Sequence, residues 1–256
     1  MGQMHIMDRK TFNQSITKIL SGEHENHGIG TLSEKTLHAV VKNYVEPDKT
    51  YHEVPVLGYV ADICRGRNIY EIQNANFHTM RKKLEIFLKE FHVTIVYPVP
   101  AVKWLRWIDE ETGEITKRRK SLKKGTPSEV FKELYKIKPF LKNPNLSVWI
   151  LMIDMEESRL LNGWSEDRKK GSCRYDRIPL ELREEHHLEC IQDYRMFIPP
   201  EMDRFTSKDY AKATNLTVKR AQTALNILYS LGVVDRAGKK GRSYLYTVSD
   251  TGGDSI

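Results

Sequence analysis

The sequence has 256 residues, of which 39% are hydrophobic and 29% charged, the composition of a folded globular protein rather than a disordered chain. It has no apolar run long enough to cross a bilayer and no signal-peptide core, and its three cysteines are widely spaced. We therefore expect a cytoplasmic protein with no membrane partner. The net charge of +7 favours a polyanionic binding partner.

Residues 1–30 are expected to be an N-terminal segment with one short amphipathic helix. The motif Thr31–Glu34 is a capping box, which predicts a second helix whose apolar face packs on a sheet. Glu34 lies one turn before Leu37, the first apolar residue of that face. Its carboxylate therefore either caps the helix or reaches a site beside the sheet, and the sequence leaves both roles open.

Short strands are predicted over 53–56, 59–63 and 69–73, because apolar runs there are separated by turn residues. Side chains alternate along a strand, so Glu71 and Gln73 share a face, and Asp62 meets them if the two strands align. Acidic residues are poor strand formers, yet Asp62 and Glu71 both stand inside apolar runs. A bound cation would explain their burial, whereas an ordinary surface hairpin is the alternative.

A core-facing helix over 77–91 and a buried strand over 93–96 are predicted next. The segment 103–124 predicts another hairpin, whose returning arm carries a basic cluster suited to phosphate contacts. The basic residues of this cluster are Lys117, Arg118, Arg119, Lys120, Lys123 and Lys124.

A helix over 130–141 and a very apolar strand over 146–155 follow. The charged residues after that strand, including Glu156 and Glu157, are interpreted as its exit into a loop. The segment 181–191 is interpreted as a charged helical stretch. Pro199 and Pro200 suggest a domain boundary near residue 200.

The order of helix, hairpin, third strand, helix and strand, with Asp62 followed by Glu71-Ile72-Gln73, resembles the PD-(D/E)XK nuclease superfamily. Members in bacterial competence and restriction systems have the most similar segments. The resemblance is close over residues 31–98 and loose over the next hundred. It implies an α/β (α+β) fold with a restriction-endonuclease-like αβββαβ core, a mixed sheet flanked by helices, within a domain of residues 31–200.

The resemblance also implies a metal site and catalytic residues. Mg²⁺ or Mn²⁺ would be held by Asp62, Glu71 and the main-chain carbonyl of Ile72, with Glu53 as a further candidate ligand. Glu34 matches a helix glutamate of many members. Gln73 stands where the family usually has lysine; it can hydrogen-bond the attacking water but carries no positive charge. The candidate catalytic residues are Asp62, Glu71, Gln73 and Glu34.

Residues 201–256 predict two helices joined by a turn, then a hairpin around Gly238–Gly241 and a short tail. This pattern resembles a winged helix-turn-helix domain, which would place its second helix in the DNA major groove and its hairpin on phosphates. Protein contact or homodimerisation is the alternative use. The DNA-binding candidates are Lys219, Arg220, Gln222, Thr223 and Asn226 on the second helix, and Lys239, Lys240 and Arg242 on the hairpin.

The expected function is a metal-dependent DNA endonuclease that hydrolyses phosphodiester bonds with a Mg²⁺-activated water. The winged helix would position duplex DNA rather than single-stranded DNA. The alternative is a catalytically inactive nuclease-fold protein that binds DNA as a regulator or as a subunit of a complex. RNA is a further alternative substrate.

Overall fold

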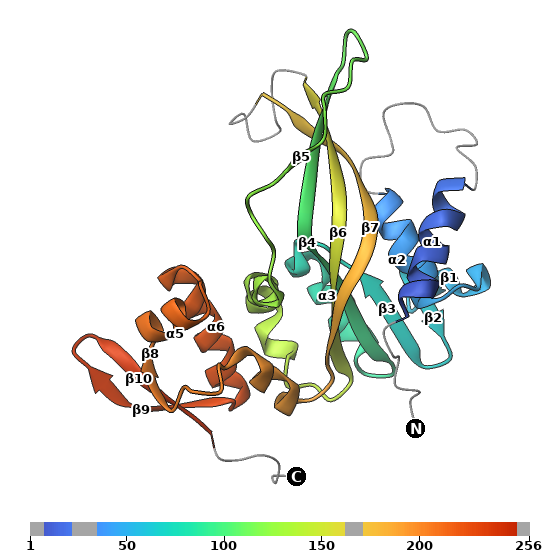
Figure 1. Ribbon diagram of the computed structural model, residues 1–256. Coiled ribbons are helices and arrows are strands. Elements are labelled where there is room, and N and C mark those ends of the chain that lie inside the picture. The colour runs from blue at the N-terminus through green and yellow to red at the C-terminus, as the bar shows by residue number, and fades with distance from the viewer. Residues whose placement is uncertain (1–7, 22–34, 162–170, 250–256) are drawn as a thin grey trace.

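A seven-stranded mixed sheet lies at the centre of the computed structural model, which describes residues 8–21, 35–161 and 171–249. The strand order is β1-β2-β3-β4-β6-β7, with β5 paired to β4. β4 runs parallel to β3 and β6, and the other neighbours are antiparallel. Helices flank the sheet on both faces (Figure 1), so the predicted mixed α/β class is confirmed. Among the described residues, no helix is long and apolar enough to cross a membrane.

The strands of this sheet are β1 His52–Val56, β2 Tyr59–Arg65, β3 Asn68–Ile72, β4 His92–Asp109, β5 Arg119–Lys120, β6 Leu146–Leu161 and β7 Cys173–Leu188. The α-helices are α1 Arg9–Ser21, α2 Lys35–Val45, α3 Arg81–Phe87, α4 Phe131–Leu134, α5 Ser207–Ala213 and α6 Val218–Leu231. The 3₁₀ helices are η1 Lys49–Tyr51, η2 Phe77–Met80, η3 Pro127–Val130, η4 Tyr135–Phe140 and η5 Ile191–Phe197. A second sheet contains β8 Arg204–Thr206, β9 Val234–Lys240 and β10 Ser243–Val248.

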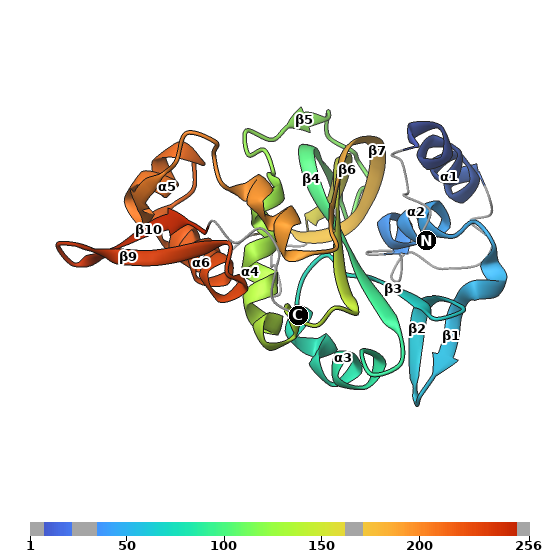
Figure 2. The same cartoon turned by 90° about the horizontal axis from the view of Figure 1, so that it is seen from below.

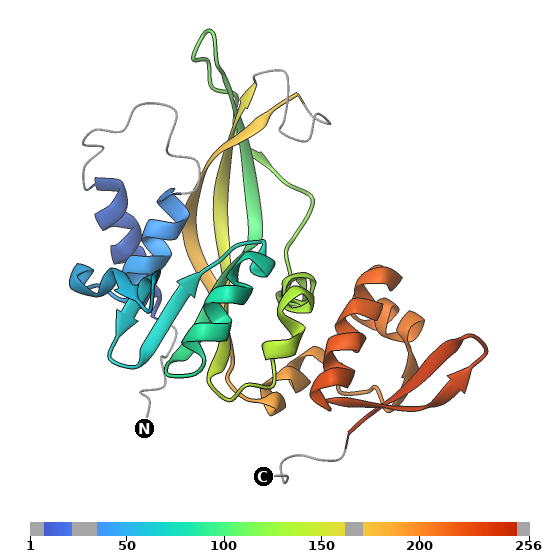
Figure 3. The same ribbon diagram turned by 180° about the vertical axis from the view of Figure 1, so that it is seen from behind.

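The apolar sequence of β6 places this strand between two hydrophobic layers. Val148 and Ile150 belong to a layer shared with α3 and α4, whereas Trp149 and Leu151 belong to a layer shared with α1 and α2. This division follows from the alternation of side chains along a strand. Figure 3 shows α3 against the face of the sheet opposite to α1 and α2. The sheet core is therefore buried on both faces.

Three strands continue far beyond these layers. β4 has 18 residues, and β6 and β7 have 16 each, which corresponds to roughly 50–60 Å of extended chain. In Figure 1 their far ends project past the helices, and we call this projection the arm, residues 101–120, 154–161 and 173–181. The strand predicted over 93–96 is thus the first part of β4, and the predicted hairpin from residue 103 continues that strand and returns through β5.

Two predictions about the charged segments beside these strands are wrong. Residues 181–188 are not helical but lie in β7, with Glu181 opposite Asp154 and Leu188 opposite Val148. Glu157 does not lie in a loop but inside β6. Pairing with β6 and burial of apolar side chains such as Leu182 outweigh the helix propensity of the glutamates.

The C-terminal residues form a compact unit of β8–β10, α5 and α6, seen at the left of Figure 2. Thr206 and Asp209 form a reciprocal capping box at the start of α5, and the Thr217 hydroxyl accepts a hydrogen bond from the Arg220 amide at the start of α6. Gly232 ends α6 with φ of 82°, a left-handed conformation that glycine adopts without strain. The predicted order of two helices and a hairpin is present.

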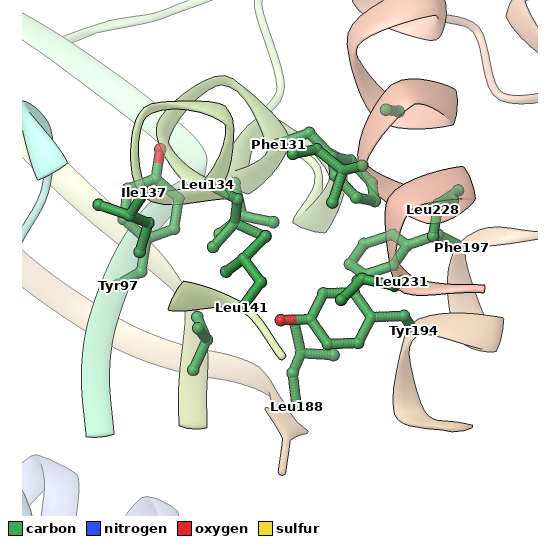
Figure 4. Packing of buried hydrophobic residues seen from close by; sticks show 14 of the residues in the cluster. Tyr97, Phe131, Leu134, Ile137, Leu141, Leu188, Tyr194, Phe197, Leu228 and Leu231 are labelled. Atoms are coloured by element: carbon green, nitrogen blue, oxygen red, sulfur yellow. The ribbon is translucent and has the colours of Figure 1, made fainter. Parts of the chain in front are cut away.

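The C-terminal unit shares its hydrophobic core with the central sheet. The rings of Phe131 in α4 and Phe197 in η5 are 4.6 Å apart between centroids. Figure 4 shows them between the sheet and Leu228 and Leu231 of α6. The two parts are therefore packed together and not merely connected by a linker.

Replacing Phe197 with Ala should lower the free energy of unfolding by about 3–5 kcal/mol, because it removes a buried ring from this shared core. Chemical denaturation measures the loss. Leu122→Ala is the control, since Leu122 is 96% exposed and its removal should change stability by less than about 0.5 kcal/mol. Equal effects of the two substitutions would contradict the packing described here.

Candidate functional site

A polar pocket of about 230 Å³ lies where β2 and β3 separate. Their pairing ends at Ile63 and Tyr70, so Asp62 and Glu71 are the next residues on the two strands. The pocket lining comes from α2, β2, β4, α3 and the end of β3. It consists of Leu37, His38, Asp62, Glu71, Ile72, Gln73, Asn74, Lys83 and Pro98. The structure thus brings together Asp62, Glu71 and Gln73, as the alternation of the strands predicted.

Asp62 is held by groups from two elements. Its Oδ2 accepts a hydrogen bond from the main-chain N–H of Ile72 at 2.7 Å and lies 3.3 Å from Nε2 of His38. Burial raises the pKa of Asp62, but the hydrogen bond and charge of His38 and the Ile72 N–H outweigh it. The pKa of Asp62 therefore lies below its ordinary value, and the carboxylate is charged at neutral pH.

Glu71 is only 3% exposed, and its negative charge is less well compensated than that of Asp62. Its Oε2 accepts a hydrogen bond from Nζ of Lys83 at 2.6 Å, while its Oε1 is buried without a hydrogen-bond partner among the described residues. Burial, followed by the negative charge of Asp62, raises the pKa of Glu71 to about 7, although Lys83 acts in the opposite direction. A buried carboxylate oxygen without a partner is destabilising unless something else binds it.

The donor atoms of this pocket suit Mg²⁺ or Mn²⁺. Mg²⁺ is commonly bound through one or two carboxylates, and waters and substrate phosphates complete its six oxygen ligands. Asp62 and the unpartnered oxygen of Glu71 could provide the carboxylate ligands of such a site, and Ile72, whose carbonyl is the further predicted ligand, lines the same pocket. Among the described residues, no group of three or more His, Cys, Asp and Glu side chains is arranged so that the group alone could hold a metal ion.

The two remaining predicted site residues are Glu34 and Glu53. Glu34 lies outside the described residues. Glu53 belongs to β1, its side chain is 57% exposed, and it pairs with Lys42 of α2. The alternative that Glu53 completes the metal site is therefore not supported, because its carboxylate is compensated elsewhere.

Sequence reasoning missed two pocket residues. Lys83 belongs to the basic run Arg81–Lys83, a pattern typical of a solvent-facing helix side, yet its side chain is only 17% exposed and binds Glu71. His38 follows the apolar residue Leu37 on α2 and reaches Asp62. Neither position has a distinguishing pattern in the sequence; only the packing of α2 and α3 on the strands brings them in.

The basic cluster of residues 117–124 is exposed at the base of the returning strand of the arm. The guanidinium of Arg118 stacks 4.6 Å from the ring centroid of Trp104, and Nζ of Lys120 lies 5.5 Å from it. Arg118 also lies 3.5 Å from Glu156, and Lys123 lies 3.4 Å from Glu129. Trp104 therefore orders part of an otherwise solvent-facing basic surface.

The five candidates on α6 divide between two sides of the helix. Lys219 and Gln222 are exposed, but Arg220 approaches Glu129 at 3.9 Å, and the amide oxygen of Asn226 accepts a hydrogen bond from Lys138 at 2.8 Å. The Arg220 side chain remains 52% exposed beside Glu129 of η3, whereas Asn226 is half-buried where it contacts Lys138 of η4. The DNA-groove role of both residues stays a prediction.

The remaining DNA-binding candidates are Thr223 on α6 and three residues of the C-terminal hairpin. Thr223 is half-buried, and its hydroxyl donates to the carbonyl of Lys219 at 3.0 Å. The hairpin residues Lys239, Lys240 and Arg242 are exposed, as expected. These three therefore remain available to a polyanion.

Comparison with known proteins gives a family but no activity. The family model described as "Domain of unknown function (DUF8091)" matches residues 35–189, from the start of α2 to just past β7. An uncharacterised protein of Treponema pallidum (strain Nichols) is 26% identical over 226 residues, which cover 85% of this chain and 86% of that protein. No solved structure matches the chain.

The raised pKa of Glu71 predicts a pH-dependent effect of Glu71→Gln on stability. Between pH 4.5 and about 7 the folded state retains a proton that the unfolded state releases, so the stability contributed by this group falls as the pH rises through that window. Without divalent ions, the variant should therefore gain up to about 3 kcal/mol relative to the wild type between pH 5 and pH 8.

Denaturation at several pH values in EDTA measures this gain. Glu85→Gln, an exposed change on α3, is the control and should show no such trend. A difference between Glu71→Gln and the wild type that stays constant with pH would contradict the ionisation described above.

Proposed function

The chain belongs to the DUF8091 family, and because that description names no activity, we propose a function from the site: metal-dependent hydrolysis of phosphodiester bonds in DNA. The observation that carries this proposal is the pair of neighbouring carboxylates, the partly buried Asp62 on β2 and the buried Glu71 near the end of β3, where the two strands separate. One of them has an unpartnered oxygen, and Lys83 stands beside it. Such groups bind a divalent cation and a phosphate together.

The order of elements supports the proposal. α2, β1, β2, β3, α3 and β4 follow one another as the αβββαβ order of the PD-(D/E)XK nucleases requires, with Asp62 on the second strand and Glu71 on the third. The two helices and hairpin of the C-terminal unit are likewise compatible with a winged helix. We propose both relationships on this basis.

In the proposed reaction, the pocket residues would bind the metal ion, position its ligands and orient the attacking water. Asp62, Glu71 and the Ile72 carbonyl would hold Mg²⁺, and the bound ion would supply Lewis-acid stabilisation of the charge that develops on the phosphate. His38 holds the Asp62 carboxylate in place. Gln73 lines the pocket and would orient a water through its side-chain amide.

Lys83 would supply the positive charge that Gln73 lacks. Its Nζ lies 2.6 Å from Glu71, in the same pocket as Gln73, and it comes from α3 rather than from the strand. An ammonium group in a largely buried site stabilises negative charge more strongly than one in water. The absence of lysine at position 73 is therefore compatible with catalysis.

The proposal predicts that the protein nicks or cleaves plasmid DNA with Mg²⁺ or Mn²⁺ and not with EDTA. Asp62→Ala should lose at least about 10³-fold in rate, and Lys83→Met about 10²-fold, because each removes a group that holds or balances charge at the reacting phosphate. Lys82→Met, an exposed neighbour, is the matched control and should retain activity. Equal cleavage by wild type and Asp62→Ala would refute the site.

A catalytically inactive DNA-binding protein is the second candidate, favoured by the neutral side chain at position 73. It predicts tight DNA binding without metal affinity. Calorimetric titration of Mn²⁺ separates the two, because a nuclease site should bind Mn²⁺ in the wild type and lose that binding in Glu71→Gln. Absence of Mn²⁺ binding to the wild type would favour the inactive protein.

The basic cluster on the arm is proposed to contact the DNA backbone. Replacing Arg118, Arg119 and Lys120 with Gln should reduce the slope of log K against log salt concentration by up to about 3, since each phosphate contact contributes about 0.9. Fluorescence anisotropy with a short duplex measures the slope. Replacing the exposed Lys10, Lys18 and Lys49 instead should leave the slope unchanged, and an unchanged slope in the arm variant would exclude the contact.

A further inference from the structure

A fully buried carboxylate on the arm is surrounded by cations. Oε1 of Glu157 accepts hydrogen bonds from Nε and Nη2 of Arg159 at 2.8 and 2.7 Å. Its Oε2 accepts from Nε of Arg177 at 3.1 Å and from Nζ of Lys103 at 3.3 Å, and Nε of Arg174 lies 3.8 Å away. Glu157 itself has 0% exposed side chain. We call Lys103, Arg159 and Arg177 the arm cations.

The strand register assembles this cluster. Glu157 stands opposite Arg177 on β7, while Lys103 on β4 stands opposite Met155, two residues before Glu157. Met155 belongs to the hydrophobic layer of α1 and α2, so Glu157, two residues later, faces the same side. Three neighbouring strands therefore bring their charged residues around Glu157, with Arg177 directly opposite and Lys103 and Arg159 offset by two residues on either side.

The charge of the cluster is not balanced. The three arm cations carry three positive charges, and within the described chain Glu157 is the only carboxylate with which they pair. Their side chains are only 15–22% exposed, so water compensates the surplus charge poorly. Burial lowers the pKa of Lys103, and the nearby Arg177 and Arg159 lower it further, against the effect of Glu157. If these cations served only to neutralise Glu157, fewer of them would be enough.

The arm cations lie on the side of the sheet from which α2 reaches the polar pocket. The hydroxyl of Thr36 donates to Asp176, the residue before Arg177, at 2.8 Å. Two residues later on α2, His38 contacts Asp62 of the pocket. Along β4, Lys103 follows the pocket residue Pro98 by five positions, which is about 17 Å of extended chain. A nucleic-acid strand could span that distance within about five nucleotides.

We propose that Lys103, Arg159 and Arg177 bind a backbone phosphate of the nucleic acid, held in position by Glu157. Planar guanidinium groups bind phosphate oxygens through two parallel hydrogen bonds, and the lysine adds a point charge. Glu157 fixes the cations before binding, which reduces the ordering that binding requires. This inference rests on the proposed function, because it assigns the substrate of that pocket a second, non-reacting contact.

The test uses binding without metal, so that cleavage does not enter the result. In EDTA and in an Asp62→Ala background, the triple change Lys103→Gln, Glu157→Gln and Arg177→Gln should weaken binding of a short DNA duplex about tenfold and reduce the salt slope by about one. Glu157 is replaced together with two of its cations, because a buried carboxylate that lost them would destabilise the fold. Replacing the exposed Lys10 and Lys18 with Gln, which removes the same number of cations, should leave the affinity near wild type.

Arg177→Gln alone provides a milder variant, because Lys103 and Arg159 still neutralise Glu157. It should fold as the wild type does and weaken binding at least threefold. The proposal is overturned if both arm variants bind DNA like the Lys10 and Lys18 control.

Inorganic phosphate as the probe distinguishes failure of this site from failure of the proposed function. In EDTA, phosphate at about ten times its Kd should raise the Tm of the wild type by about 3–6 °C relative to chloride at equal ionic strength, and the triple variant should not respond. A phosphate response without DNA binding would keep the anion site and reject the nuclease. DNA cleavage with unchanged affinity in both arm variants would keep the nuclease and reject the anion site.

Discussion

The pairing of β4 with both β3 and β6 is the constraint on which the rest of the structure depends. β4 lies between two parallel neighbours over Val93–Val96, and the main-chain N–H of Gln73 bonds to the carbonyl of Val96 just where β3 ends. This pairing fixes the end of β3, and so the place at which Glu71 meets Asp62. The same strand continues into the arm and carries Lys103 to Glu157. β4 therefore positions the polar pocket, the hydrophobic core and the arm cations around Glu157.

The two buried acidic sites have opposite charge balances, and this difference explains why different ligands suit them. At the pocket, two carboxylates share His38 and Lys83, and burial, followed by the negative charge of Asp62, raises the pKa of Glu71 against the effect of Lys83. On the arm, one carboxylate is over-compensated: burial raises the pKa of Glu157, but the surrounding cations outweigh burial and lower this pKa to about 2. Residual negative charge attracts a cation and residual positive charge an anion. A phosphodiester with a bound divalent ion contains both kinds of partner.

The sequence could predict the features that depend on local pattern. The continuous apolar run of residues 93–96 indicated a strand buried on both faces, and the very apolar run of 146–155 indicated another strand. The alternation around Asp62 and Glu71 indicated that their side chains converge if the two strands align. It could not predict features set by tertiary pairing. The glutamates within residues 181–185 favour a helix locally, but these residues pair with the edge of β6 and so form part of the strand β7. Lys83 and His38 enter the pocket only because α2 and α3 pack on opposite faces of the sheet, which no spacing in the chain encodes.

The docking of the C-terminal unit limits how it can act on nucleic acid. Arg220 and Asn226 approach Glu129 and Lys138, and Phe131 packs against Phe197 beneath them. Moving the unit would expose that shared apolar core, so its orientation relative to the sheet is fixed by hydrophobic burial. The surface left for a polyanion is the side of α6 with Lys219 and the β9–β10 hairpin. If the unit binds DNA there, the rigid connection through α4 sets a constant spacing between the bound segment and the pocket.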